Sequence, residues 1–256
     1  MFNFLRPRQP VRASGPAIPP GMRVYAIGDV HGRLDLLDRL LDAIANDDAT
    51  RESTEVRLIF LGDLIDRGPQ SREVIDRVLA LKDNDIDVAV LRGNHEEVFQ
   101  LVLDGDEEAL RFFNRIGGRE TILSYGIDAE FFACAELPEL QAALIENVPA
   151  RHIQLLRECE DMVEIGDYLF VHAGIRPGTA LDQQRTADLR WIRGGFLDFE
   201  GSHPRMIVHG HTPSAEIEWR SNRIGVDTGA YESGVLSAIG IEGAERWALS
   251  TALETV

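Results

Sequence analysis

Cysteine is scarce in this sequence: its 256 residues include two, Cys134 and Cys159. Neither belongs to a closely spaced pair, so the pattern disfavours a thiolate metal site and a disulfide framework of the kind that holds small secreted domains together. Two thiols in a chain of this length are typical of a reducing compartment. We therefore expect a cytoplasmic protein.

Long hydrophobic runs are also missing. The apolar start, residues 1–5, is much shorter than a signal-peptide core or a membrane span, and arginines follow it, so we expect neither export nor a membrane anchor. Proline interrupts residues 1–20 too often for a helix or a strand to continue, which predicts a mobile N-terminal arm. An alternative is that Phe2, Phe4 and Leu5 dock on a neighbouring subunit or partner.

Basic residues are fewer than acidic ones, 26 against 43, which gives a net charge of −17. This balance disfavours a nucleic-acid partner, because such binding depends on a broad basic surface. With 44% hydrophobic residues the rest of the chain can bury a full core, and we expect residues 21–256 to form one α/β domain. No feature of the sequence indicates the oligomeric state.

Three motifs rich in glycine and in Asp, Asn or His follow one another in the first part of the chain. They are Gly28–Gly32 (GDVHG), Gly62–Gly68 (GDLIDRG) and Arg92–Glu96 (RGNHE), and they follow the apolar runs 22–27, 56–61 and 86–91. Each run has the composition of a strand buried on both faces, and amphipathic helical patterns lie between the runs. This order predicts parallel strands whose carboxyl ends bring all three motifs to one edge of a sheet.

Two later histidines also follow apolar runs. His172 comes directly after the run 168–171, and His211 comes shortly after the run 206–208, in the sequence His-Gly-His-Thr-Pro. Asp, His and Asn side chains without cysteine suit borderline or hard divalent cations such as Mn, Fe, Zn or Ni. We therefore expect a metal site where these strand ends converge.

Together the motifs resemble the metallophosphoesterases, and within them the phosphoprotein phosphatase branch of bacterial and phage Ser/Thr phosphatases and diadenosine tetraphosphatases. The resemblance extends over residues 22–240 and implies a β-sandwich of two mixed sheets flanked by helices. It also implies two metal ions that share one carboxylate, the first held by Asp29, His31 and Asp63, the second by Asp63, Asn94, His172 and His211. Pro213 stands where many members of the wider superfamily have a further histidine, which favours the phosphatase branch.

The resemblance also assigns an acid. His95 would protonate the leaving group, and Asp66 would orient its imidazole and raise its pKa. A structural alternative for Asp66 is that its side chain caps a helix beginning near Pro69.

Arginines would bind the phosphate oxygens. Arg67 and Arg92 belong to the motifs, and Arg193 matches a third family arginine, with Arg190 as its alternative. Surface ion pairs for Arg67 and Arg92, and a solvated loop for Arg193, are the structural alternatives. Tyr231 resembles a family tyrosine near the metals but is equally typical of a packing residue.

Substrate choice is expected to depend on residues 97–160. Their apolar spacing predicts a helical insertion, which would shape the walls of the pocket. Short strand patterns follow from residue 162 onward, with a hairpin turn at Gly166–Asp167, and predict a second sheet.

The leading hypothesis is therefore a metal-dependent phosphoric monoester hydrolase with two Mn ions, acting on serine/threonine phosphoproteins or small phosphate esters, with phosphotyrosine as an alternative substrate. A water activated between the ions would be the nucleophile, so no covalent enzyme intermediate is needed. The alternative is hydrolysis of a nucleotide polyphosphate such as diadenosine tetraphosphate. A silent binding module is a third hypothesis, which the complete ligand set beside His95 and Asp66 disfavours.

Overall fold

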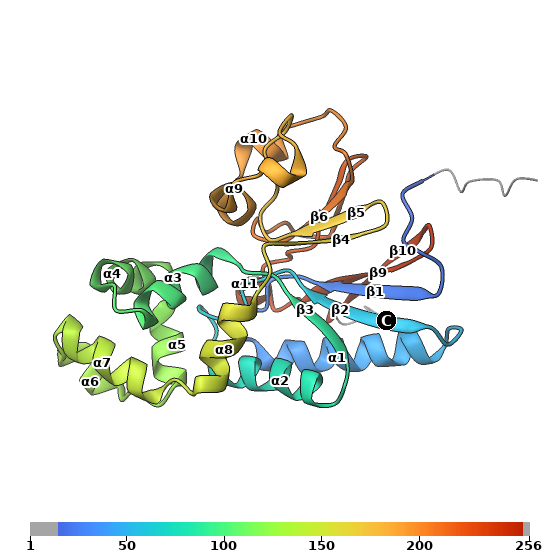
Figure 1. Cartoon of the computed structure of the whole chain (residues 1–256). Coiled ribbons are helices and arrows are strands. Elements are labelled where there is room, and N and C mark those ends of the chain that lie inside the picture. Colours follow the sequence, from blue (N-terminus) through green and yellow to red (C-terminus); the bar gives the residue numbers. More distant parts are fainter. Residues whose placement is uncertain (1–14, 253–256) are drawn as a thin grey trace, which may run out of the picture.

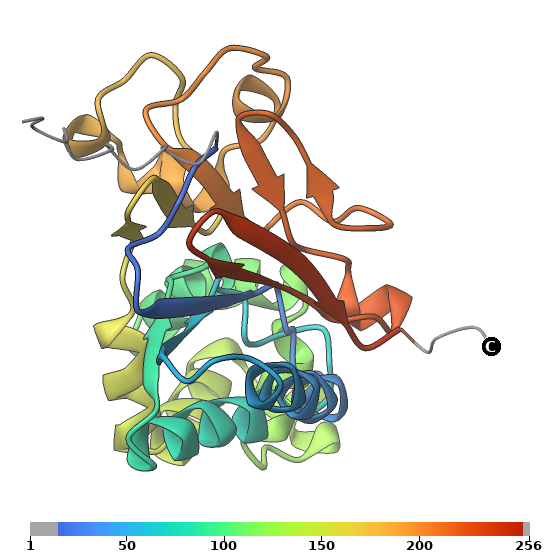
Figure 2. The ribbon, with the colours of Figure 1, turned by 90° about the vertical axis from the view of Figure 1, so that its right-hand side faces the viewer.

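The computed structural model describes residues 15–252. Two five-stranded sheets pack against each other, with helices on their outer faces (Figures 1 and 2). This is the predicted α/β sandwich of two mixed sheets. Among the described residues, no helix is both long and apolar enough to cross a membrane.

The first sheet contains the three predicted parallel strands. Its members are β1 (Met22–Ile27), β2 (Glu55–Phe60), β3 (Asp87–Val90), β9 (Ser237–Glu242) and β10 (Glu245–Ser250), in the order β10-β9-β1-β2-β3. β1, β2 and β3 are parallel, and β9 pairs antiparallel with both β1 and β10. The predicted ends of the first three strands are correct to within one residue. All three motifs therefore follow neighbouring strands at the same edge.

The second sheet has the order β4-β5-β6-β8-β7. Its members are β4 (Met162–Ile165), β5 (Tyr168–Val171), β6 (Met206–His209), β7 (Glu218–Trp219) and β8 (Arg223–Gly225). β4 and β5 form the predicted hairpin, whose turn contains Gly166 with a φ of 58°. β5 and β6 are parallel, so His172 and His211 follow strands that end at one edge of this sheet.

The side chains of β1 alternate between two cores. Val24 and Ala26 belong to the core between the sheets, where Phe170 and Val208 pack from the second sheet. Tyr25 and Ile27 belong to the core under α1 (Leu34–Ala49) and α2 (Ser71–Asp83), the helices below the first sheet in Figure 1. α9 (Thr186–Trp191) and α10 (Gly194–Leu197) cover the outer face of the second sheet. In both sheets, the strands that lead to the motifs are thus supported by buried apolar layers.

The segment 97–160 is helical, as predicted. Its helices are α3 (Asn94–Leu103), α4 (Glu107–Ile116), α5 (Gly118–Ser124), α6 (Ala129–Cys134), α7 (Leu137–Asn147) and α8 (Ala150–Glu158). Two short helices lie outside this segment, η1 (Leu181–Gln183) and α11 (Ala230–Ser233). α4 begins where the Asp106 side chain accepts a hydrogen bond from the Ala109 N–H, and ends at Gly117, whose φ is 115°. The group lies beside the strand ends (Figure 1).

The predicted N-terminal arm, residues 1–20, is described from residue 15 onward. Ile18 is buried in the core between the sheets, and its N–H donates to Gly243 O at 2.9 Å. The Asp167 N–H donates to Ala17 O. This part of the predicted arm therefore packs against the domain, and its boundary at residue 20 was placed too late. Phe2, Phe4 and Leu5 lie outside the described residues.

Candidate dinuclear metal centre

The loops at the strand ends have an unusual backbone. Six non-glycine residues among those described have φ in the left-handed region, and one of them, Asp85, lies in a remote turn. The other five are His31, Asp63, Asp66, Arg67 and His211, with φ between 47° and 71°. Such conformations cost free energy and persist where the surrounding structure fixes them, which is typical of functional sites.

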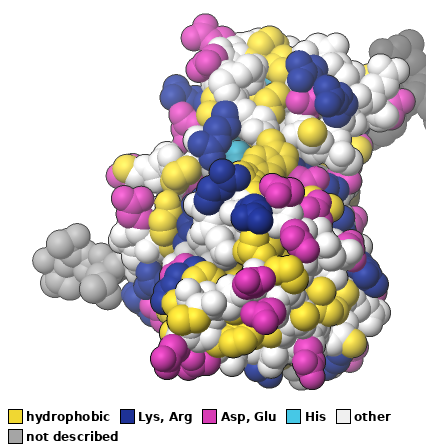
Figure 3. All heavy atoms as spheres, turned by 90° about the vertical axis from the view of Figure 1, so that its left-hand side faces the viewer, with side chains coloured by type: hydrophobic (Ala, Val, Ile, Leu, Met, Phe, Trp, Pro, Cys, Tyr) yellow, Lys and Arg dark blue, Asp and Glu magenta, His cyan; other side chains and the backbone are white. Residues whose placement is uncertain are grey.

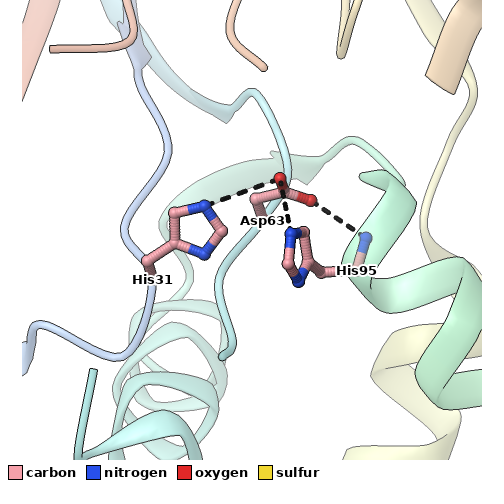
Figure 4. Close-up of side chains that lie close together, drawn as sticks. All are labelled: His31, Asp63 and His95. Atoms are coloured by element: carbon pink, nitrogen blue, oxygen red, sulfur yellow. Dashed lines mark hydrogen bonds and ion pairs between the residues drawn. The ribbon is translucent and has the colours of Figure 1, made fainter. Parts of the chain in front are cut away.

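Asp63 lies at the centre of the converging side chains (Figure 4). Its Oδ2 is 3.7 Å from His31 Nε2, 3.8 Å from His95 Nε2 and 3.5 Å from His172 Nε2. Two ligands that each bind one cation at about 2.1 Å are separated by roughly 3–3.5 Å, so these distances suit shared coordination better than hydrogen bonding. Burial alone would raise the pKa of Asp63, but the positive charge that the surrounding histidines carry when protonated lowers it below its ordinary value.

Hydrogen bonds fix the tautomers of two of these histidines. His31 Nδ1 donates to Ile65 O and His172 Nδ1 donates to Leu61 O, each at 2.8 Å. Burial lowers the pKa of both rings, that of His31 to about 3, so each is neutral and has a lone pair on Nε2. The His31 lone pair faces an acceptor oxygen, Asp63 Oδ2, and the His172 lone pair faces two acceptor oxygens, Asp63 Oδ2 and Asn94 Oδ1, the latter at 3.0 Å. A cation between them would satisfy all of these atoms.

The atoms that could bind a metal ion fall into two groups. His31, Asp63 and His95 form one, and Asp63, His172 and His211 form the other; within each group the donor atoms lie within 4.8 Å of one another. All of these side chains are buried. The arrangement fits two divalent cations that share Asp63, with Asn94 next to the second group.

Asp29, predicted as a ligand of the first ion, has one buried oxygen without a hydrogen-bond partner, Oδ1. Its Oδ2 accepts the His211 N–H at 2.9 Å. Burial and the negative charges of Asp227 and Asp63 raise the pKa of Asp29 well above its ordinary value. A divalent cation would offset this repulsion and give Oδ1 a partner. The candidate group that contains His31 and Asp63 has His95 as its third member and does not include Asp29. The ligand role of Asp29 therefore stays a prediction.

His95 and Asp66 form a buried pair. His95 Nδ1 is 2.6 Å from Asp66 Oδ2, and the two side chains are 1% and 0% exposed. Burial alone would lower the pKa of His95, but the charges of Asp63 and Asp66 raise it above its ordinary value. The Asp66 carboxylate does not cap a helix, because α2 begins after Gln70 without a side-chain cap.

Two of the predicted arginines lie beside the histidines. Arg67 Nη2 is 3.2 Å from His95 Nε2, and the guanidinium carbon lies 4.5 Å from the centre of the Tyr231 ring. Arg193 Nε donates to His211 Nε2 at 3.1 Å. On the molecular surface, basic side chains gather around an accessible histidine, with hydrophobic side chains next to them (Figure 3).

The other two arginines bind protein groups. Arg190 donates to the carboxylates of Glu97 and Asp161 and is buried. Of the two alternatives for the third arginine, Arg193 is therefore the one that contacts the histidines. Arg92 Nη2 donates to the carbonyls of Leu156 and Arg157 at the end of α8, so its phosphate-binding role stays a prediction.

Glu96 is a site residue to which the sequence analysis gave no role. It is fully buried and accepts three backbone N–H groups: Oε2 accepts those of Asp63 and Gly93, and Oε1 accepts that of Leu64, at 2.8–3.0 Å. Burial and the charge of Asp63 raise its pKa to about 7, and the N–H donors oppose this shift. Glu96 thus joins two of the motif loops. Its place inside the RGNHE motif was the available signal.

Replacing Glu96 by glutamine is expected to destabilise the protein by about 2–4 kcal/mol, because an amide NH₂ would face backbone donors inside a buried site. Thermal or urea unfolding would measure the loss. Glu146→Gln is the matched control, since Glu146 is exposed on α7. Equal unfolding of the two variants would contradict the structural role of Glu96.

Comparison with known proteins identifies the family. The family model of calcineurin-like phosphoesterases matches residues 22–236. The chain belongs to this family. Members are hydrolases that act on phosphoesters, and their fold implies divalent metal ions, which agrees with the donor set around Asp63.

Relatives within the family carry several names. A bis(5'-nucleosyl)-tetraphosphatase PrpE [asymmetrical] of Anoxybacillus flavithermus is 28% identical over 233 residues, which are 83% of this chain and 88% of that protein. A crystal structure provisionally described as a diadenosine tetraphosphatase has a TM-score of 0.62 at 18% identity and covers 92% of this chain and 98% of that one. A cold-active protein tyrosine phosphatase has a TM-score of 0.56 at 21% identity, with coverages of 91% and 81%. The two structural similarities show the calcineurin-like fold alone.

Proposed function

We propose that this protein hydrolyses nucleotide polyphosphates, with bis(5'-nucleosyl) tetraphosphates as substrates. The observation that carries the proposal is the similarity, over 83% of the chain, to a relative named for that activity. This was the alternative hypothesis from the sequence, and the names of the relatives favour it over a serine/threonine protein phosphatase. The similarity to the tyrosine phosphatase structure does not favour either substrate class, because at 21% identity it bears on the fold alone.

The metal ions are proposed to be held by the two groups that share Asp63. Asp29, His31 and Asp63 would bind the first ion, and Asp63, Asn94, His172 and His211 the second. When bound, divalent cations activate water and stabilise the charge on phosphoryl oxygens. We expect Mn to support activity, because carboxylate, amide and imidazole donors suit it.

Arg193 is proposed to bind phosphate. His211 Nε2 accepts a hydrogen bond from Arg193, which places the proton of a neutral ring on Nδ1, 3.2 Å from His172 Nε2. If His211 binds a cation through Nδ1, its proton must move to Nε2, where it meets the Arg193 donor. Arg193 then has to turn away. Its exposed guanidinium would be free for a phosphate oxygen next to the ions.

Arg193→Ala is expected to raise the KM for a nucleotide polyphosphate by about tenfold, because one charge-assisted bond to phosphate is lost. Steady-state kinetics would measure this change. Arg190→Ala is the matched control: it is expected to lower the unfolding temperature, since Arg190 ties Glu97 to Asp161, and to change KM less. A larger KM effect for Arg190→Ala would exchange the two roles.

The proposed function is tested by a substrate panel. The purified protein would be freed of metal by a chelator, resupplied with Mn or left without it, and given diadenosine tetraphosphate, phosphoserine and phosphothreonine peptides, and para-nitrophenyl phosphate. We expect Mn-dependent turnover with the highest kcat/KM for the dinucleotide. Chromatography of the products would separate asymmetric cleavage, to ATP and AMP, from symmetric cleavage, to two ADP. Preference for phosphopeptides would overturn the proposal in favour of a protein phosphatase.

A further inference from the structure

The helical insertion touches the loop after β2, which carries Asp66, one member of the proposed acid pair. Gly117 O accepts the Arg67 N–H at 3.0 Å, and Ser124 Oγ accepts the Arg72 N–H at 3.1 Å. A Cβ on Gly117 would lie 2.7 Å from Arg67 Cγ, so the chain passes close to the loop without room for a side chain. The turn between α4 and α5, together with α5 itself, therefore lies directly on the loop that follows β2.

Between these two contacts, Thr121 of α5 binds Asp66 twice. Its hydroxyl accepts the Asp66 N–H at 2.9 Å and donates to Asp66 Oδ1 at 2.6 Å, and Ser71 Oγ lies 2.8 Å from it. Thr121, Asp66 and Ser71 are each 0% exposed. The Asp66 carboxylate thus has one oxygen bound to Thr121 and the other, Oδ2, directed at His95 Nδ1.

We propose that Thr121 is a positioning residue for the acid, through which the insertion holds the Asp66 carboxylate in the orientation that binds His95. The proposal rests on the proposed acid role of His95. Asp66 has φ of 71°, and its N–H is accepted both by Thr121 Oγ1 at 2.9 Å and by Ser71 Oγ at 3.0 Å, so Thr121 is one of two side chains that fix this backbone. In a buried site, a carboxylate that loses one of its two partners turns or takes up a proton, and either change weakens its bond to the imidazole.

The first test needs no turnover. A proton held between His95 Nδ1 and Asp66 Oδ2 at 2.6 Å is expected to give a far-downfield imidazole N–H signal in the proton NMR spectrum of the protein loaded with diamagnetic Zn. Absence of this signal in His95→Asn assigns it. Thr121→Val, which keeps the shape of the side chain but removes its hydroxyl, is expected to shift or broaden the signal, and Thr121→Ser to restore it.

The second test compares two aryl phosphates. Phenolate is a more basic leaving group than para-nitrophenolate and depends more on the acid. Thr121→Val is expected to lower kcat about tenfold with phenyl phosphate and by less than about threefold with para-nitrophenyl phosphate, and Thr121→Ser to retain most of both. Ser124→Ala is the matched control: it removes another hydroxyl of α5, one that binds the first turn of α2 without touching Asp66, and is expected to leave the ratio unchanged.

The outcomes separate the inference from the function on which it rests. An unchanged N–H signal in a folded Thr121→Val protein would overturn the positioning role of Thr121. If Asp66→Asn changes the ratio between the two esters and Thr121→Val does not, the acid pair stands and the inference fails. If the wild-type protein hydrolyses none of the phosphate compounds, the proposed function fails, and the NMR experiment still tests the contact between Thr121 and Asp66.

Discussion

Replacing Asp63 by asparagine is expected to lower kcat/KM by about 10³-fold and to reduce the bound metal, because this one carboxylate faces both groups of metal-binding histidines. An amide has no charge and presents a single oxygen, so it cannot serve two cations as a carboxylate does. The folded structure should persist, because Asp63 Oδ1 accepts the backbone N–H of His95 at 3.1 Å and the side-chain oxygen of Asn can accept the same bond. Metal content would be measured by elemental analysis beside the kinetics.

Asp85 provides a control for Asp63. It is an exposed aspartate with φ of 59°, so Asp85→Asn makes the same chemical change in the same kind of backbone, away from the site. We expect this variant to keep full activity and metal content. Two metal ions per chain and wild-type kinetics in Asp63→Asn would refute the shared-ligand assignment.

Replacing His95 by asparagine is expected to lower kcat by about 10²-fold while both metal ions remain bound, because a general acid contributes on that scale. The loss should be greatest for substrates with basic leaving groups. His95 also lies within ligand distance of Asp63 and His31, so metal analysis decides between the two roles. Loss of one ion in His95→Asn would make this histidine a ligand.

The pH dependence follows from the same pair. An acid acts in its protonated form, so activity is kept below the pKa of His95 and lost as the pH rises through it. Asp63 and Asp66 raise that pKa above its ordinary 6.5, against the opposing effect of burial, so the alkaline limb of kcat/KM is expected above pH 6.5. Asp66→Asn should move this limb to lower pH. An alkaline limb that does not move would contradict the role of Asp66.

The strand ends could be predicted because the signal for each was local. A run of buried strand residues and the candidate metal ligand after it are neighbours in sequence. Parallel strands joined by right-handed crossovers have their carboxyl ends at the same edge of the sheet, so the candidate ligands are expected there together. Asp63 and Asn94 follow β2 and β3 within a few residues. The helical segment was also predicted correctly, and within it α4 ends at Ile116, before Gly117 adopts φ of 115°.

Contacts between distant segments could not be predicted. Thr121 lies 55 residues from Asp66, in a segment without motifs, and reaches it because α5 turns back after Gly117. The sequence also could not decide whether Arg190 or Arg193 reaches the site. A helix of six residues is too short for its apolar spacing to show where it ends, and α9 ends between the two arginines. Ile18 was assigned to the arm because the segment around it is rich in proline. Its side chain is nevertheless buried in the core between the sheets.

The proposed metal centre draws its candidate ligands from both sheets, and the thickness of the core between the sheets sets how far apart those side chains are. His172 Nδ1 donates across the gap to Leu61 O, directly above that core. Ala26 and Ala89 are small residues that the first sheet contributes to this core, and Phe170 packs in the same core from the second sheet. A larger side chain at either alanine would push the sheets apart and draw His172 away from Asp63, although no polar group had been touched. For the proposed pair of ions, the spacing, and with it the rate of the proposed reaction, would in this way be encoded partly by the size of hydrocarbon side chains in the interior.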